Sequence, residues 1–125
     1  MLIRFTGRIS GKQFITPVAY KQFGDTVLIG LAETHNRVWW RNYRDVWPME
    51  VKLRGQWQSG FAKYLNETDK DYVEQWQTLL ESESWMPKIF HTDYEAKTGI
   101  TAEQKAFLLQ YCGLVKFSPK ENAFE

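Results

Sequence analysis

Residues 2–32 have the sequence LIRFTGRISGKQFITPVAYKQFGDTVLIGLA, in which three strand-like stretches are separated by two turns. Apolar and polar side chains alternate along residues 2–7, as they do in a half-buried strand. Turns are expected at Gly11 and Gly24, and Gly11 is free to take a positive φ. Residues 27–32 are apolar on both faces and should form the most buried strand.

The middle strand, expected over residues 14–20, contains Pro17. Proline has no backbone N–H and cannot donate to the hydrogen bonds of a sheet. Pro17 therefore marks a sheet edge, a bulge, or a place where a ligand takes the position of a neighbouring strand. In each case, backbone groups near Pro17 are left for something other than a regular strand.

Beyond the third strand the pattern becomes helical. Residues 36–45, NRVWWRNYRD, are expected to form a helix with Asn36 or Thr34 as its N-cap, ended by Pro48. In the next segment, residues 49–53, apolar and charged side chains alternate, which predicts another half-buried strand.

The second half of the chain mixes strands with helices. Strands are expected over residues 57–65 and 113–117, and a loop over residues 85–97. Two residue pairs match the capping box that opens a helix, namely Thr68 with Asp71 and Thr101 with Gln104. The apolar stripe that follows the first pair predicts a helix packed on the sheet.

These elements predict a mainly β (α+β) fold made by one domain, residues 1–125. There are about six strands, mostly joined by short turns, and two or three helices. Regular strand–helix–strand alternation is missing, so an antiparallel barrel with peripheral helices fits better than a parallel sheet.

Composition narrows the functional classes. Sixteen basic and fifteen acidic residues give a net charge of +1, which argues against a nucleic-acid partner. No stretch is apolar and long enough to cross a membrane, and the N-terminus does not resemble a signal peptide. Cys112 is the only cysteine, and its apolar neighbours predict burial. We therefore expect a soluble, cytoplasmic protein without disulfides and without a membrane partner.

Motifs for metal or nucleophilic chemistry are missing. His35 and His91 have no Cys, His or carboxylate at the spacing of metal ligands, so no metal is expected. Neither a Walker loop nor a nucleophile elbow occurs. The sequence does not identify a catalytic residue.

Three motifs in order suggest a family. They are Thr6-Gly-Arg-Ile-Ser-Gly-Lys12, Thr16-Pro-Val-Ala-Tyr20 and Asn36-Arg-Val-Trp-Trp-Arg-Asn42. Together they resemble the deazaflavin-dependent nitroreductase family, which belongs to the flavin-binding split-barrel group together with pyridoxamine-phosphate oxidases. The resemblance covers about residues 3–55, and residues 113–119 resemble the family's closing strand.

The resemblance implies a split barrel that holds a flat, phosphorylated cofactor in a cleft. The first hairpin and the start of the tryptophan segment would bind phosphate, the interrupted strand would offer backbone groups to the ring, and Trp39 or Trp40 would line it. The implied cofactor-binding residues are Arg8, Ser10, Gly11, Lys12, Thr16, Pro17, Val18, Ala32, Asn36, Arg37, Trp39 and Trp40.

Departures from the family pattern leave two cofactors open. Phe14 stands where the family commonly has an arginine, and Arg37-Val38 replaces the proline before the tryptophans. The loop before the tryptophans is also shorter by about three residues in a rough alignment. FMN and a deazaflavin of the 8-hydroxy-5-deazaflavin type therefore both remain candidate cofactors.

The expected function is that of a flavin- or deazaflavin-dependent oxidoreductase, similar to nitroreductases and quinone reductases, acting on a small organic substrate. The alternative is a non-catalytic split-barrel protein that binds flavin, haem or a similar planar ligand. The resemblance also implies a homodimer, and the aromatic share of 16% is compatible with one.

Overall fold

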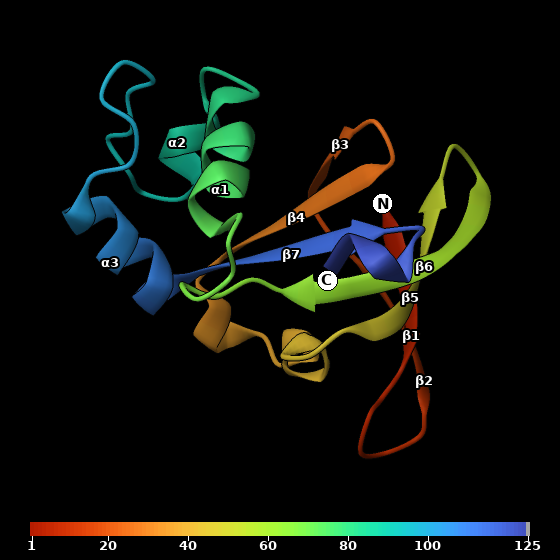
Figure 1. Ribbon diagram of the computed structural model, residues 1–125. Helices are drawn as coiled ribbons and strands as arrows, with labels where there is room; N and C mark the ends of the chain where they lie inside the picture. The colour runs from red at the N-terminus through yellow and green to blue at the C-terminus, as the bar shows by residue number, and fades with distance from the viewer. Residues whose placement is uncertain (125) are drawn as a thin grey trace.

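One antiparallel sheet of seven strands, in the order β2-β1-β5-β6-β7-β4-β3, forms the centre of the molecule (Figure 1). The computed structural model describes residues 1–124, and of His35 the backbone only. The strands are β1 Leu2–Thr6, β2 Gln13–Pro17, β3 Tyr20–Phe23, β4 Thr26–Ala32, β5 Trp47–Leu53, β6 Gln56–Tyr64 and β7 Cys112–Ser118. This arrangement confirms the expected mainly β fold.

The two edge strands, β2 and β3, follow each other in the chain and are separated only by Val18 and Ala19. The sheet therefore curls until its edges meet at this bend, but β2 and β3 do not pair with each other, so the barrel is split. The single strand expected over residues 14–20 is thus wrong. Pro17 lies on the edge strand β2 paired with Leu2, and the hydrogen bonds to β1 continue beyond it, because the Val18 N–H donates to the Met1 carbonyl oxygen at 2.8 Å. The missing N–H of Pro17 therefore faces away from β1.

Two apolar cores lie on opposite faces of β4, which is why residues 27–32 are apolar throughout. Val27, Ile29 and Leu31 face the barrel interior. Leu28 faces the helices, in a second core that includes Trp76. Those helices are α1 (Tyr72–Glu81), α2 (Met86–Ile89) and α3 (Ala102–Tyr111), which gather at one side of the sheet (Figure 1). The prediction that residues 27–32 form the most buried strand is wrong, because four of these six residues are buried, whereas six of the seven residues of β7 are.

The helix expected over residues 36–45 is wrong, because the segment forms two short 3-10 turns, η1 (Thr34–Asn36) and η2 (Trp39–Tyr43). Neither Thr34 nor Asn36 is an N-cap; Glu33 and Val38 hold those positions. The Trp40 indole N–H lies 3.0 Å from the Thr34 carbonyl oxygen and 2.7 Å from that of Arg37. These carbonyls therefore bind the indole in place of a continuing helix.

Pro48 does not follow a helix but lies in β5. Pairing of β5 with β1 ends at Glu50, so at Pro48 the strand has only β6 beside it. The missing N–H of Pro48 can therefore face a side without a strand partner, as proline in a sheet requires.

The two capping boxes have different outcomes. Thr101 accepts from the Gln104 backbone N–H, and the Gln104 side chain accepts from Thr101 N–H, which confirms the second box. The first is wrong: the N-cap of α1 is Asp71, while Thr68 bonds Asn66. Residues 85–97, expected as a loop, contain the short helix α2. Within residues 1–124, no helix has the length and apolar character of a membrane span.

Candidate functional site

A cleft of about 370 Å³ opens at the bend between β2 and β3. Its volume lies within the range of small-molecule sites, roughly 300–1,000 Å³. Four segments supply its lining, which consists of Pro17, Val18 and Ala19 from the bend, Gly30, Leu31 and Ala32 from β4, Arg37 and Trp39 from the turns around η2, and Ile89 from α2. The cleft is thus formed where the barrel is split.

The end of β4 gives this cleft an open backbone edge. Pairing between β3 and β4 ends at Tyr20 and Ile29, whereas β4 stays paired with β7 as far as Ala32. Within the described residues, Gly30–Ala32 therefore has a strand partner on one side only. Amide and carbonyl groups on such an edge are ready to bind a ligand that carries donors and acceptors.

Trp39 forms one aromatic wall of the cleft. Its ring lies 6.0 Å from the ring of Tyr43 and 6.2 Å from that of Phe5, and the interplanar angle to Tyr43 is 75°. These two contacts fix the half-buried indole against the barrel core. Trp40 is not part of this wall, because it stacks on Tyr64 at a centroid distance of 4.6 Å.

Arg37 is the charged residue of the cleft. It is exposed, and its guanidinium has no hydrogen bond or ion pair among the residues that the structure describes. A guanidinium presents a planar fork of donors that suits phosphate and carboxylate groups. Arg37 is thus able to bind an anionic group at the mouth of the cleft.

The Arg8 guanidinium is occupied by backbone oxygens. Arg8 Nε donates to the Asn42 carbonyl oxygen (3.0 Å), and Nη2 donates to those of Asp45 (3.3 Å) and Val46 (3.1 Å). The Arg8 backbone N–H also donates to Asn42 Oδ1 (2.8 Å), and the guanidinium lies 4.1 Å from the Trp47 ring centre. The first hairpin and η2 therefore meet through contacts within the protein.

The twelve residues expected from the sequence fall into two groups. The structure brings Pro17, Val18, Ala32, Arg37 and Trp39 together in the cleft. Thr16 precedes Pro17 in β2 without lining the cleft, and the others that do not line it are Arg8, Ser10, Gly11, Lys12, Asn36 and Trp40.

Four lining residues were missed by the sequence prediction, namely Ala19, Gly30, Leu31 and Ile89. Gly30 had a signal: a glycine inside an apolar strand marks a close approach by another group. An added Cβ there would lie 2.4 Å from the Phe90 ring. Ile89 had no signal, because its helix was expected to be a loop.

Nearby buried groups that could carry a proton are held neutral. Burial raises the pKa of Tyr43, whose hydroxyl donates to the Pro48 carbonyl oxygen at 2.9 Å. Burial also raises the pKa of Cys112 to about 11, so this thiol is not a nucleophile at neutral pH. Among the residues described, no group of three or more His, Cys, Asp or Glu is arranged to hold a metal ion.

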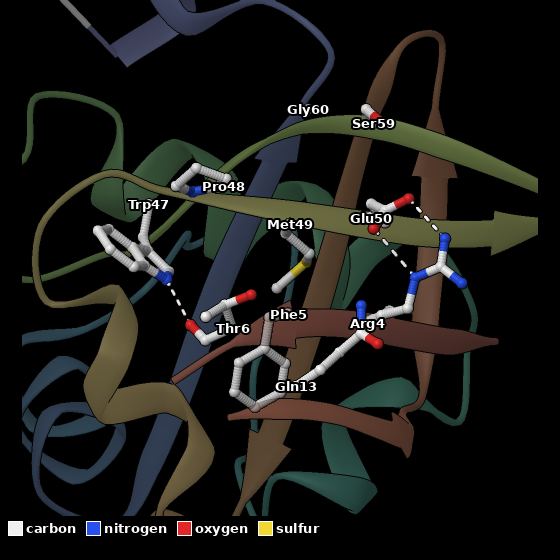
Figure 2. A pocket seen from close by; sticks show the side chains of 10 residues that line it. All are labelled: Arg4, Phe5, Thr6, Gln13, Trp47, Pro48, Met49, Glu50, Ser59 and Gly60. Atoms are coloured by element: carbon white, nitrogen blue, oxygen red, sulfur yellow. Dashed lines mark hydrogen bonds and ion pairs between the residues drawn. The ribbon is translucent and has the colours of Figure 1, made fainter. Parts of the chain in front are cut away.

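A second hollow, of about 300 Å³, lies on the outer face of β1, β5 and β6 (Figure 2). Arg4 Nε and Nη2 donate to the two carboxylate oxygens of Glu50 at 3.0 and 2.7 Å, and this pairing lowers the pKa of Glu50. Figure 2 also shows the Trp47 indole N–H donating to the Thr6 carbonyl oxygen, at 2.8 Å. The charges of this hollow neutralise each other, so the cleft at the bend is the better candidate site.

Comparison with known families identifies the class of protein. The family model described as F420H(2)-dependent quinone reductase matches residues 1–103. The chain belongs to this family. The matched range includes every residue that lines the cleft. No curated protein matches the chain.

Membership of the F420H(2)-dependent quinone reductase family confirms the resemblance seen in the sequence motifs. It also places the protein among deazaflavin-dependent oxidoreductases.

Proposed function

We propose that this protein binds an F420-type deazaflavin in the cleft at the β2–β3 bend and uses it to reduce a quinone. The family supports the cofactor class, and the observation that carries the proposal is a cleft lined by both the open edge of Gly30–Ala32 and the Trp39 ring. A flat ring with hydrogen-bonding groups along one side matches a cleft with an aromatic wall and a free backbone edge.

Different lining residues would bind different parts of the cofactor. Backbone groups of Gly30–Ala32 and of Ala19 would hydrogen-bond the polar side of the ring, and Trp39 would pack along the ring. Arg37 would pair with the anionic tail of the cofactor. We propose Arg37 as the principal anion ligand, because the Arg8 guanidinium already binds three carbonyl oxygens.

The chemistry requires little from the protein beyond orientation. When bound, the reduced cofactor supplies a hydride. A quinone that accepts one hydride and one proton becomes a hydroquinone, and the cofactor is left oxidised. Arg37 is the one titratable side chain in the described lining of the cleft, and arginine keeps its proton. The proton therefore comes from water, and the cleft holds the two reactants together.

Cofactor titration tests the proposal. The purified protein is titrated separately with an F420-type deazaflavin and with FMN, and binding is followed by cofactor fluorescence. We expect tighter binding of the deazaflavin. Arg37→Ala should weaken that binding about 10- to 100-fold, the range for a lost charged hydrogen bond of ~1.5–3 kcal/mol.

A matched control removes the same charge elsewhere. Arg54 lies in the β5–β6 turn with φ at 51°, a conformation that glycine adopts without strain, so Arg54→Gly should leave cofactor binding unchanged. If wild type and Arg37→Ala bind the deazaflavin with equal affinity, Arg37 does not bind the anionic tail. Tighter binding of FMN than of the deazaflavin would contradict the proposed cofactor.

We also propose that the protein is a homodimer that buries the apolar outer side of the first hairpin. Ile9 is fully exposed and Ile15 is 57% exposed, and both lie in this hairpin region. Exposed apolar groups of this size favour an interface. Sedimentation velocity should give the mass of a dimer, and Ile15→Glu should shift it to the monomer. A wild-type monomer at micromolar concentration would contradict the proposal.

A further inference from the structure

A second, apolar chamber adjoins the cleft. It has a volume of about 150 Å³, and residues of β3 and β4 and of helices α1 and α2 line it. Ala19, Gly30 and Ile89 line both the cleft and the chamber. Ala19 and Gly30 add at most a methyl group to this shared wall, and the Phe90 ring that packs on Gly30 belongs to the wall of the chamber, so a ligand that fills the cleft lies within reach of the chamber.

The chamber offers apolar surface without a free charge. Its other walls include Leu79, Trp85, Met86 and Phe90. Lys21 also lines it, but its ammonium pairs with Glu83 at 2.6 Å. An apolar group would thus enter without stripping water from an unpaired charge.

The rim of the chamber leaves large apolar side chains in water. Trp85 is 51% exposed, Ile89 is 43% exposed and Tyr20 is 41% exposed. Three such side chains around one opening are a patch that a ligand can cover. The volume corresponds to about five groups the size of a water molecule or a methylene, taking ~30 Å³ for each.

We infer that this chamber binds an apolar chain on the quinone, about one five-carbon isoprenoid unit long, while the quinone ring lies in the cleft. The inference rests on the proposed function, because it requires a quinone beside the bound cofactor. It commits to an alkyl or prenyl chain because the lining is apolar, the volume is small and the chamber shares three lining residues with the cleft.

Two quinones with the same ring test this inference. Menadione has no chain, and its derivative with one prenyl group has a chain of five carbons. Each buried CH₂ contributes about fourfold in affinity. We therefore expect the prenylated quinone to have at least a tenfold higher kcat/KM than menadione in the wild-type protein. A second prenyl unit should add little, because the chamber holds only one.

Trp85 is the residue to change, because it lines the chamber and not the cleft. Trp85→Ala should remove most of the advantage of the prenylated quinone and leave menadione reduction unchanged, whereas Trp85→Phe should keep that advantage. Leu109→Ala is the matched control, since Leu109 is an exposed apolar residue of α3 that lines neither space.

The outcomes separate the two proposals. Failure to bind the deazaflavin or to reduce menadione would overturn the proposed function. Equilibrium dialysis would then still compare the affinities of the protein for the two quinones. Equal affinities would overturn the inference that the chamber binds the prenyl chain. The inference would also be overturned if both quinones were reduced with equal kcat/KM. It would be overturned as well if wild type and Trp85→Ala preferred the prenylated quinone over menadione by the same factor. A change of oligomeric state in Trp85→Ala without loss of the preference would assign the rim to a protein interface instead.

Discussion

At the scale of single residues, Arg8 connects two segments that are far apart in the chain. Its guanidinium binds one carbonyl oxygen within η2 and two just after it, and it lies over Trp47. We expect Arg8→Ala to lower the free energy of unfolding by about 1 kcal/mol, since the contacts are exposed and the net gain from each is modest. The free energy of unfolding of Arg8→Lys should lie between those of wild type and Arg8→Ala, because an ammonium lacks the planar fork of donors that a guanidinium has. Urea denaturation measures both.

Lys12→Ala provides the comparison for Arg8. Lys12 is an exposed residue of the same hairpin, and its ammonium has no partner among the described residues. Its substitution should leave the urea midpoint where it is. Equal midpoints for Arg8→Ala and Lys12→Ala would contradict the structural role of Arg8. Whether Arg8 also contacts a cofactor phosphate stays a prediction.

Cys112 makes stability depend on pH in the alkaline range. Burial raises its pKa in the folded protein to about 11, whereas an unfolded cysteine has a pKa of about 8.5. The thiol form therefore stabilises the fold fully below pH ~8.5, and this contribution is lost as the pH rises toward 11. Between pH 8 and 10, the urea midpoint should fall less in Cys112→Ala than in wild type.

Thiol reagents give a direct check on Cys112. The native protein should react slowly with a maleimide at pH 8, and the urea-unfolded protein should react fast. Fast labelling of the native protein would contradict the burial of this side chain.

At the scale of elements, the helix starts can be compared directly. Thr101→Ala removes a complete capping box and should lower stability by about 1 kcal/mol. Thr68→Ala removes a residue with the same sequence signature that does not cap α1, so it should change stability by less than about 0.5 kcal/mol. Thermal unfolding measures the stability of the two variants. A larger loss of stability in Thr68→Ala than in Thr101→Ala would contradict this prediction.

The elements that the sequence predicted well have patterns that local chemistry determines. The alternation in β1 and β5 and the capping box at Thr101 depend on neighbours within a few residues. The helix expected over residues 36–45 failed because tertiary contacts override local propensity there. The Trp40 indole N–H binds two carbonyl oxygens, and the Arg8 guanidinium binds those of Asn42, Asp45 and Val46 from a distant part of the chain.

At the scale of the whole molecule, the sequence predicted the barrel but only part of the cleft. Pro17 indicated a break, and the family resemblance indicated Trp39 and Arg37. The contribution of α2 could not be predicted, because a four-residue helix has too few residues to show a periodic pattern. Ile89 comes close to the bend only through the packing of α2 in the second core.

Cofactor binding should stabilise the whole fold, because the cleft lies where the two edges of the sheet meet. A ligand that binds only the folded state at 100 times its Kd adds about 2.7 kcal/mol. We expect a higher Tm with saturating deazaflavin, and a smaller rise at the same concentration for Arg37→Ala. Scanning calorimetry at several cofactor concentrations measures this, and a Tm independent of cofactor would contradict binding to the folded protein.

The shortness of the bend limits how thick a ligand can be. From Pro17 to Tyr20 the chain advances three residues, which fully extended span about 10–11 Å. A planar ring in contact with atoms on both faces needs about 7–8 Å between those atoms. Flat molecules therefore fit beside the bend and bulky ones do not. This preference lies in the connectivity of the main chain, so side-chain substitutions should preserve it, whereas inserting glycines after Val18 should relax it.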